Sequence, residues 1–231
     1  MQSAFSTSTP VYKQFLQVRS LPFYLLVATL LFSVLLIFAF WLLDWALWGL
    51  GLLILAAWLP LVMATMSAIY QQNRWLALLY LLVTVQGAHM IEHISQLVEL
   101  HLLGLTGPKA SGIVGFLNIE WVHLIWNTLM LICAIMLFYG YRHNRWLLVL
   151  LLFSIYHEIE HIYIMSVYLS THIMGTPGLL AQGGLIGGGL PIKRPDLHGI
   201  YAIFQEALLV IAYLQERKKV LLLPRERSAL S

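Results

Sequence analysis

The stretch WLALLYLLVTVQGAHMIEHISQLVELHLL, residues 75–103, is mostly apolar and long enough to cross a membrane, yet it contains HMIEH at 89–93. A bilayer core of about 30 Å requires about 20 apolar residues in a helix. Ionisable side chains are costly in such a helix and usually mark a functional site. A second apolar stretch contains HEIEH at 157–161. The doubled motif predicts a membrane helix bundle that buries a histidine site.

The composition supports a membrane protein. Of the 231 residues, 60% are hydrophobic and 10% are charged, whereas a soluble domain has about 25% charged residues. The predicted fold class is all-α: a polytopic membrane protein with six transmembrane helices. The expected spans are about 22–43, 46–70, 75–103, 118–140, 146–172 and 197–215. A single cysteine, Cys133, excludes an intrachain disulfide and a cysteine-based metal site.

The lysines and arginines predict the orientation in the membrane. Ten of the 13 lie on the same side as the N-terminus. By the positive-inside rule, the protein is expected in the cytoplasmic (inner) membrane with both termini cytoplasmic. The glycine-rich loops 104–117 and 173–196 are then extracytoplasmic. The expected partner is the lipid bilayer and not a nucleic acid, because the net charge of +3 comes mainly from the ends and short loops.

Eight of the nine histidines form four pairs that occur in the same order in two parts of the chain. The pairs are His89 and His157, His93 and His161, His101 and His172, and His123 and His198. In addition, HLLGLTG at 101–107 and HIMGTPG at 172–178 share the pattern H-x-x-G-x-x-G. The order predicts a parallel internal repeat, in which spans three and four match spans five and six about a pseudo-two-fold axis along the membrane normal.

The repeat divides the chain into five predicted regions. They are a cytoplasmic N-terminal segment (1–21), a scaffold helix pair (22–74), a first histidine repeat (75–145), a second histidine repeat (146–216) and a basic cytoplasmic tail (217–231). The scaffold pair contains no histidine, so the chemistry is expected in the two repeats.

Each repeat carries a set of potential metal ligands. Residues three and four apart share a helix face, so each HxxxH pair can bind one metal ion. At a rise of about 1.5 Å per residue, both pairs reach the outer half of the membrane, where a further histidine opens the next helix. The predicted metal ligands are His89, His93, His123 and Glu92 in the first repeat, and His157, His161, His198 and Glu160 in the second. Two equivalent sets predict two transition-metal ions.

Other polar residues receive supporting roles. The residues predicted to act in catalysis are Glu92, Glu160 and Glu158. The rim of the site is predicted to contain His101, His172, Glu120, Asp196 and Glu206. His143 lies in an inner turn without a counterpart, and it is expected to be solvated.

The histidine-rich helices resemble those of membrane di-iron hydroxylases and desaturases. The resemblance rests on the HxxxH pairs at 89–93 and 157–161 and on the separated histidines at 123 and 198. The HxxHH boxes of those families are absent, and their sites usually face the cytoplasm. The resemblance implies two iron ions and an oxidoreductase that oxidises a lipidic or small apolar substrate with molecular oxygen. Because the sequence has no nucleotide-binding fingerprint, electrons are expected from a partner membrane subunit, another electron donor or a quinone. Zinc and copper also suit imidazole ligands.

A zinc hydrolase is the first alternative. HEIEH contains H-E-x-x-H, in which His157 and His161 bind zinc and Glu158 is the general base. The segment LPIKRPDLHG at 190–199 resembles the third-ligand segment of site-2 intramembrane proteases, with Asp196 as the ligand. However, the first repeat has Met90 at the position of Glu158. The two repeats share H-x-x-E-H instead, which favours the oxidoreductase.

A non-catalytic subunit of a membrane complex is the second alternative. Its histidines would bind haem, or hold copper or zinc for transfer. Haem requires one facing pair of histidines, and six clustered histidines exceed that requirement. Two transition-metal ions are therefore predicted in preference to haem, with iron favoured.

Overall fold

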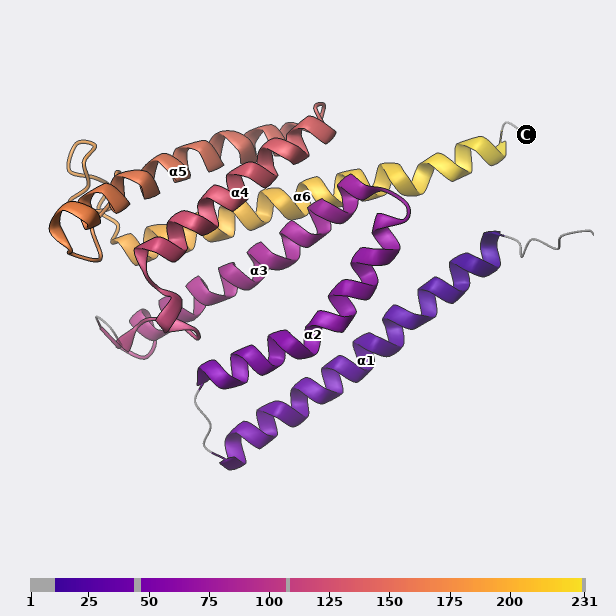
Figure 1. Cartoon of the computed structure of the whole chain (residues 1–231), viewed down its shortest axis with the longest axis horizontal. Coiled ribbons are helices and arrows are strands. Elements are labelled where there is room, and N and C mark those ends of the chain that lie inside the picture. Colours follow the sequence, from indigo (N-terminus) through magenta and orange to yellow (C-terminus); the bar gives the residue numbers. More distant parts are fainter. Residues whose placement is uncertain (1–10, 44–46, 107–108, 230–231) are drawn as a thin grey trace, which may run out of the picture. The chain divides into compact units, whose positions relative to one another are not determined.

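The computed structural model describes residues 11–43, 47–106 and 109–229. Its regular elements are α1 (Val11–Leu43), α2 (Leu47–Tyr70), α3 (Arg74–His101), the 3-10 helix η2 (Gly115–Leu117), α4 (Glu120–Gly140), α5 (Arg145–Thr171) and α6 (Arg194–Ala229). The six α-helices are each long and apolar enough to cross a membrane (Figure 1). The prediction of an all-α protein with six membrane spans is confirmed.

Two helices extend beyond the spans expected from hydrophobicity. The helix α1 begins at Val11, before the predicted first span, and α6 runs from Arg194 to Ala229 through most of the predicted tail. The start of α6 suits a helix, because Pro195 in the first turn needs no hydrogen bond for its missing N–H and Asp196 favours the positive helix end. The helix therefore starts earlier than the apolar pattern alone indicates.

The chain divides into two compact units, residues 1–72 and residues 73–231. In the first unit, α1 packs against α2, and the Trp58 Nε1–H donates a hydrogen bond of 3.2 Å to Ser33 Oγ. The second unit contains α3 to α6 and all the histidines. Any histidine site therefore belongs to the second unit.

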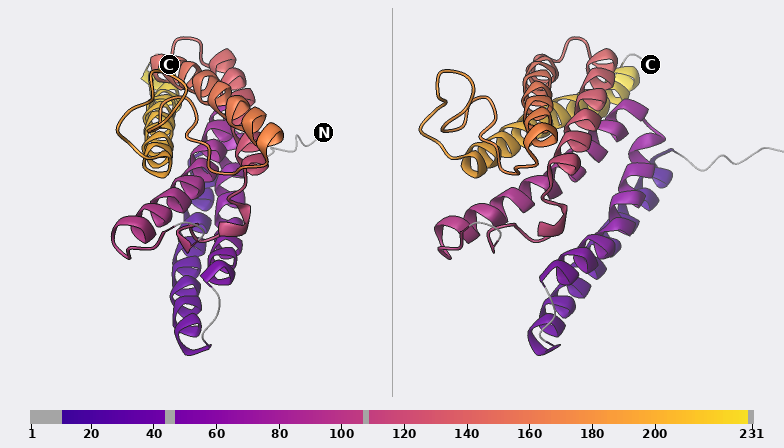
Figure 2. Two further views of the ribbon diagram at one scale, coloured as in Figure 1. Left: turned by 90° about the vertical axis from the view of Figure 1, so that its left-hand side faces the viewer. Right: turned by 60° about the vertical axis from the view of Figure 1, so that its left-hand side comes forward.

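The four α-helices of the second unit, seen from two further sides in Figure 2, pack in two main pairs. The helix α3 packs mainly against α6, and α4 packs mainly against α5. Exchanging α3 with α5 and α4 with α6 leaves this pattern of neighbours unchanged. The packing thus has the form that the internal repeat predicts.

Both repeats begin with the same helix cap. The tetrapeptide NRWL occurs at 73–76 and again at 144–147. The Asn73 side chain accepts hydrogen bonds from the backbone N–H groups of residues 75 and 76, and Asn144 does the same for residues 146 and 147. Such caps satisfy N–H groups that a helix leaves unpaired at its start. This repeated motif lies in the short turns and adds a further match between the repeats.

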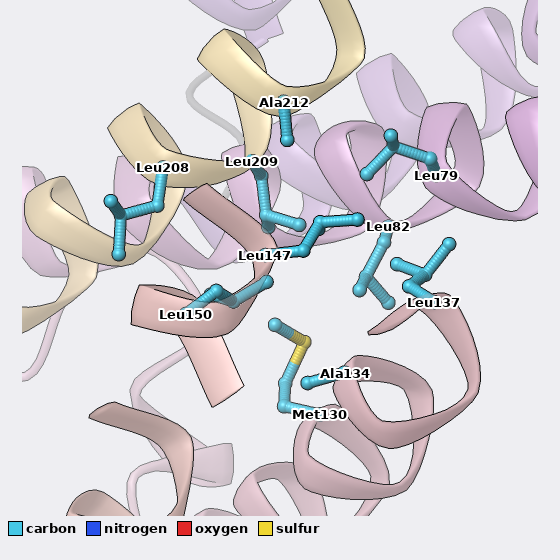
Figure 3. Close-up of a cluster of buried hydrophobic side chains, with 10 residues drawn as sticks. All are labelled: Leu79, Leu82, Met130, Ala134, Leu137, Leu147, Leu150, Leu208, Leu209 and Ala212. Atoms are coloured by element: carbon cyan, nitrogen blue, oxygen red, sulfur yellow. The ribbon is translucent and has the colours of Figure 1, made fainter. Parts of the chain in front are cut away.

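An apolar core fills the half of the second unit that contains the start of α3 and the end of α4 (Figure 3). Its fully buried members include Leu79, Leu137, Leu147 and Leu209, one from each of the four helices. The histidine motifs lie further along α3 and α5, beyond this core. The described parts of the loops, residues 102–106, 109–119 and 172–193, lie at the end of the unit where α3 and α5 finish (Figures 1 and 2). The bundle therefore has an apolar half and a polar half.

Candidate metal centre

Six histidines from four helices lie next to one another in the polar half. The helices α3 and α5 each contribute two residues spaced by one turn, and α4 and α6 each contribute one near the N-terminal end. We call His89, His93 and His123 the first histidine set, and His157, His161 and His198 the second histidine set. Five of the six are buried, and His89 is half-buried.

Contacts between the imidazole rings join the two sets into one cluster. The ring centroids of the HxxxH pairs are 4.6 Å apart on α3 and 4.7 Å apart on α5. His123 stacks on His161 at 5.8 Å, and the equivalent contact, between His93 and His198, measures 6.0 Å. His123 and His198 contact each other at 6.3 Å. Residues predicted to be ligands from separate repeats are thus brought together.

An aromatic residue flanks each HxxxH pair. Trp126 contacts His89 with ring centroids 4.9 Å apart, and Tyr201 contacts His157 at 5.0 Å. Each aromatic residue lies three positions after the histidine of its own helix, α4 or α6. Sequence reasoning missed this pair. The shared H-x-x-aromatic spacing was the signal for it.

The second histidine set converges most closely. His157, His161 and His198 can each offer one nitrogen so that all three atoms lie within 4.8 Å of one another. The two Nε2 atoms of His161 and His198 are 3.3 Å apart. Three imidazole nitrogens at such distances can hold a transition-metal ion, with a fourth position left for water or substrate.

The first histidine set is oriented by polar neighbours. His93 Nδ1 donates to Gln96 Oε1 at 3.0 Å, because Gln96 Nε2 donates in turn to the Ser111 carbonyl oxygen at 3.0 Å. His123 Nδ1 donates to the Ile119 carbonyl oxygen at 2.9 Å. Both Nε2 atoms are then unprotonated, although that of His93 lies 3.2 Å from His89 Nε2. Hydrogen bonds of this kind commonly fix the tautomer and direction of a metal-binding histidine.

The two shared glutamates are bound by the loops that follow their helices. Glu92 Oε2 and Oε1 accept hydrogen bonds of 3.0 Å from the backbone N–H groups of Ile113 and Val114. Glu160 Oε1 accepts one of 3.1 Å from Leu179 N–H, and its Oε2 lies 3.7 Å from His157 Nδ1. These contacts position the loops and, in the second repeat, a histidine.

A glycine in the left-handed region allows each loop to approach its glutamate. Gly112 has a φ of 88°, and a Cβ atom there would lie 2.3 Å from Glu92 Oε1. Gly178 has a φ of 81°, and a Cβ atom there would lie 2.7 Å from Glu160 Oε1. By this contact the counterpart of Gly178 is Gly112. The sequence pattern pairs it instead with Gly107, which lies outside the described residues.

Glu158, the candidate general base of H-E-x-x-H, has a different environment. Its Oε1 accepts a hydrogen bond of 2.7 Å from Thr128 Oγ1 on α4, and its side chain is buried. Within the described residues, its Oε2 is buried without a hydrogen-bond partner. Glu158 therefore bridges α5 to α4, a contact that the motif does not predict.

Three of the predicted rim residues lie at the loop end of the unit. His101 Nε2 and Asp196 Oδ1 are 2.6 Å apart, and the His101 side chain is 60% exposed. His172 is exposed and caps the end of α5 with a φ of 56°. Asp196, which the protease resemblance makes a zinc ligand, is thus bound to a histidine outside the six-histidine cluster.

The other two predicted rim residues are more buried. Both oxygens of Glu120 accept hydrogen bonds from the Arg194 guanidinium, at 2.8 and 2.6 Å, and Gly175 N–H donates to Oε1 at 3.1 Å. Glu206 lies beside Gly87 on α3, two turns beyond His198. The sequence analysis did not predict the pairing of Arg194 with Glu120.

A cavity of about 700 Å³ opens over the histidines. It is lined by His93, His123 and His198, by both loops, and by the Glu120–Arg194 pair. Pockets of about 300–1,000 Å³ commonly hold small molecules. The cluster is therefore accessible to a small molecule from the loop side.

Comparisons of this chain with protein-family models, with curated proteins and with solved structures found no match.

Proposed function

We propose that this protein is a membrane metalloprotein whose histidine cluster binds two transition-metal ions and oxidises a small molecule held in the cavity. The observation that carries the proposal is the convergence of His157, His161 and His198, whose ligand atoms lie within 4.8 Å of one another. A cluster that can hold a metal ion is a property of the structure. The second ion, the metal identity and the reaction are our inference.

The buried polar atoms of the second histidine set support metal binding over simple packing. The Nδ1 atoms of His157, His161 and His198 are buried and have no hydrogen-bond partner among the described residues. Buried polar atoms are nearly always paired in proteins, because an unpaired one costs about 1–3 kcal/mol. Interhelical hydrogen bonding alone would leave these three atoms unsatisfied. A bound metal ion gives each imidazole a partner on one nitrogen and makes the other a stronger donor.

The first histidine set supports a second ion. The Nε2 atoms of His89 and His93 are 3.2 Å apart, and His123 keeps its Nε2 lone pair because its Nδ1 is hydrogen-bonded. The ring contacts between the two sets support a centre in which the two proposed ions lie side by side. Imidazole with carboxylate suits iron, copper, zinc and manganese. We favour iron, because two adjacent ions of a redox metal suit oxidation.

The alternatives have less support. In a zinc hydrolase, Glu158 would have to activate a water on the metal, but its hydrogen bond is to Thr128 on α4. For haem, two histidines must face each other across a flat slot, whereas the six rings here contact one another at 4.6 to 6.3 Å. A subunit that transfers metal would use the same cluster. Catalytic turnover of a substrate distinguishes an enzyme from such a subunit.

Metal analysis and absorption spectroscopy of the purified protein test the proposal. We expect about two ions per chain after expression with iron, zinc and copper supplied, and a near-ultraviolet oxo-bridge band if the metal is iron. One ion per chain would favour the single zinc site. If no metal is bound although iron, zinc and copper were all supplied, the proposal is refuted, and the histidines serve only the packing of the helices.

The proposed orientation places the cavity on the extracytoplasmic side of the inner membrane. It rests on the charge bias, with ten lysines and arginines on one side and three on the other. A reporter enzyme fused after residue 231 should be active in the cytoplasm. Activity outside would invert the orientation. Electrons are proposed to come from a partner membrane subunit, another donor or a quinone, and co-purification from membranes tests for such a partner.

A further inference from the structure

The cavity over the histidines is lined by both polar and apolar groups. Eight of its 14 lining residues carry polar or charged side chains. Besides three histidines, these include Gln96, Ser111 and Asn118. A site for a hydrocarbon chain is normally lined mostly by apolar and aromatic side chains, since buried polar groups without partners are costly. An acyl chain would leave the hydrogen-bonding groups of these polar side chains without partners.

The Glu120–Arg194 ion pair forms part of the cavity wall. Its shortest contact is 2.6 Å, and the side chains are 5% and 16% exposed, respectively. Two of the five guanidinium N–H groups bind Glu120. Among the described residues, no further hydrogen bond of Arg194 is found, which leaves its other donors for a hydrogen-bonding ligand. The pair thus offers charge and directed donors beside His123 and His198, which line the same cavity.

Half of the residues that line the cavity come from the two loops, within residues 110–119 and 174–175. The others lie at the start of α6, at the start of α4 and in the second half of α3. The strongly exposed apolar residues along α4, such as Ile125 and Ile132, are outside it. An apolar substrate dissolved in the bilayer would approach along those residues. A molecule in water would approach through the loops.

We propose that the cavity binds a small, polar, water-soluble molecule that enters between the two loops, with the Glu120–Arg194 pair orienting it over the histidines. This inference deepens the proposed function and rests on it. It replaces the lipidic or apolar substrate that the family resemblance implied. The pair gives specificity for molecules with hydrogen-bonding groups over hydrocarbons of similar size.

Cysteine labelling tests the entrance independently of any metal. In a Cys133→Ala background, Ser111→Cys places a thiol in the cavity. Ile125→Cys places a thiol on an apolar surface of α4, at a residue that is 56% exposed. The protein in nanodiscs is treated with a charged, lipid-insoluble methanethiosulfonate. We expect Ser111→Cys to react at least tenfold faster than Ile125→Cys. Equal rates, or faster reaction of Ile125→Cys, would overturn access from water.

Ligand binding tests the polar specificity. Azide is the polar probe, decanol is the apolar probe, and the visible spectrum of the Co²⁺-loaded protein is the readout. We expect azide to change the cobalt bands and decanol to leave them unchanged. A change caused by decanol alone would overturn the polar substrate class. Failure to load Co²⁺ would refute the proposed function, and the labelling experiment would still report the entrance.

A double variant tests the role of the ion pair. Replacing a buried ion pair by apolar residues is often neutral for stability, whereas removing one partner is not. We therefore compare Glu120→Leu combined with Arg194→Met against the unmodified protein, after confirming equal cobalt content. We expect azide to bind at least threefold more weakly to the double variant. Unchanged azide affinity would show that the pair has no part in binding.

Discussion

The two histidine sets hold equivalent positions in the repeats, but their surroundings differ. In the second histidine set, the ligand atoms already lie within 4.8 Å of one another, and each Nδ1 is buried without a hydrogen-bond partner among the described residues. In the first histidine set, His93 and His123 donate their Nδ1–H to oxygens of the protein, and His89 is only half-buried. The imidazoles of the second histidine set are thus held together by packing in the buried interior, whereas those of the first histidine set are oriented by hydrogen bonds. We expect the second set to bind metal more tightly.

The largest expected effect is that of His161→Ala. This change removes a buried ligand of the second histidine set and leaves the Nε2 of His198 without its neighbour at 3.3 Å. We expect the loss of at least one ion per chain, loss of nearly all activity, and a stability decrease of about 2 kcal/mol. Elemental analysis and thermal unfolding measure these changes. His143→Ala, at an exposed turn, is the control and should retain both ions.

The next largest effect is expected from His93→Ala. If the sets bind separate ions, this variant should keep the ion of the second histidine set and lose only the other. Metal content should therefore fall from about two ions to about one. Retention of both ions would exclude His93 as a ligand. Loss of both would show that the two sets share one centre whose ions depend on each other.

The glutamates of HEIEH should differ in their effect on metal affinity. Glu160 lies 3.7 Å from His157 Nδ1, so Glu160→Gln should weaken binding by about 10–100-fold, the usual cost of losing an orienting partner. Glu158→Gln should change affinity less than threefold, because the amide oxygen can still accept the hydrogen bond from Thr128. Competition with a chelator measures both affinities. Loss of activity in Glu158→Gln with metal retained would favour the zinc hydrolase.

The loop glycines test how each glutamate holds its loop. Gly178→Ala combines a φ of 81° with a Cβ atom 2.7 Å from Glu160 Oε1. Gly175 has a similar φ of 82°, but a Cβ atom there would have no neighbour within 4 Å. We expect a loss of about 1 kcal/mol for Gly175→Ala from backbone strain, and of about 2–3 kcal/mol for Gly178→Ala. Equal losses in thermal unfolding would mean that the contact to Glu160 is unimportant.

The smallest effect is expected at the helix caps. Asn73→Ala and Asn144→Ala each remove a cap, which typically costs about 1 kcal/mol. Asn144 is buried and also donates to Glu216 Oε1 at 2.8 Å, so its replacement should cost about 1 kcal/mol more. Unfolding of the two variants under the same conditions gives the difference. A greater loss in Asn73→Ala would contradict this ranking.

Much of the fold could be predicted from local features. Hydrophobic runs of about 20 residues indicate membrane helices directly, because the bilayer sets their length. The HxxxH spacing likewise places two imidazoles on one helix face without knowledge of the partner helices. The extent of α6 could not be read in this way. Its ends depend on caps and helix propensity, and hydrophobicity does not report them.

The contacts of the charged side chains depended on the tertiary structure. Glu92 and Glu160 were predicted as metal ligands from their position between histidines, and the structure places them on backbone N–H groups 19 to 22 residues away along the chain. Whether they also bind metal stays a prediction. The Glu120–Arg194 pair joins two helix starts that are 74 residues apart. The spacing of residues along the sequence does not show which residues so far apart in the chain are in contact.

The sequence by itself determined the helices, their number and the candidate metal ligands, because all three follow from the composition and spacing of residues along single segments. Only the tertiary structure decided that histidines of both repeats form one cluster, that the loops bind the glutamates and which residues line the cavity. The physical reason is that these features depend on how helices pack, and a packing arrangement is the joint result of many contacts between distant residues. The internal repeat connects the sequence with the packing, because the equivalent helices form equivalent pairs, α3 with α6 and α5 with α4.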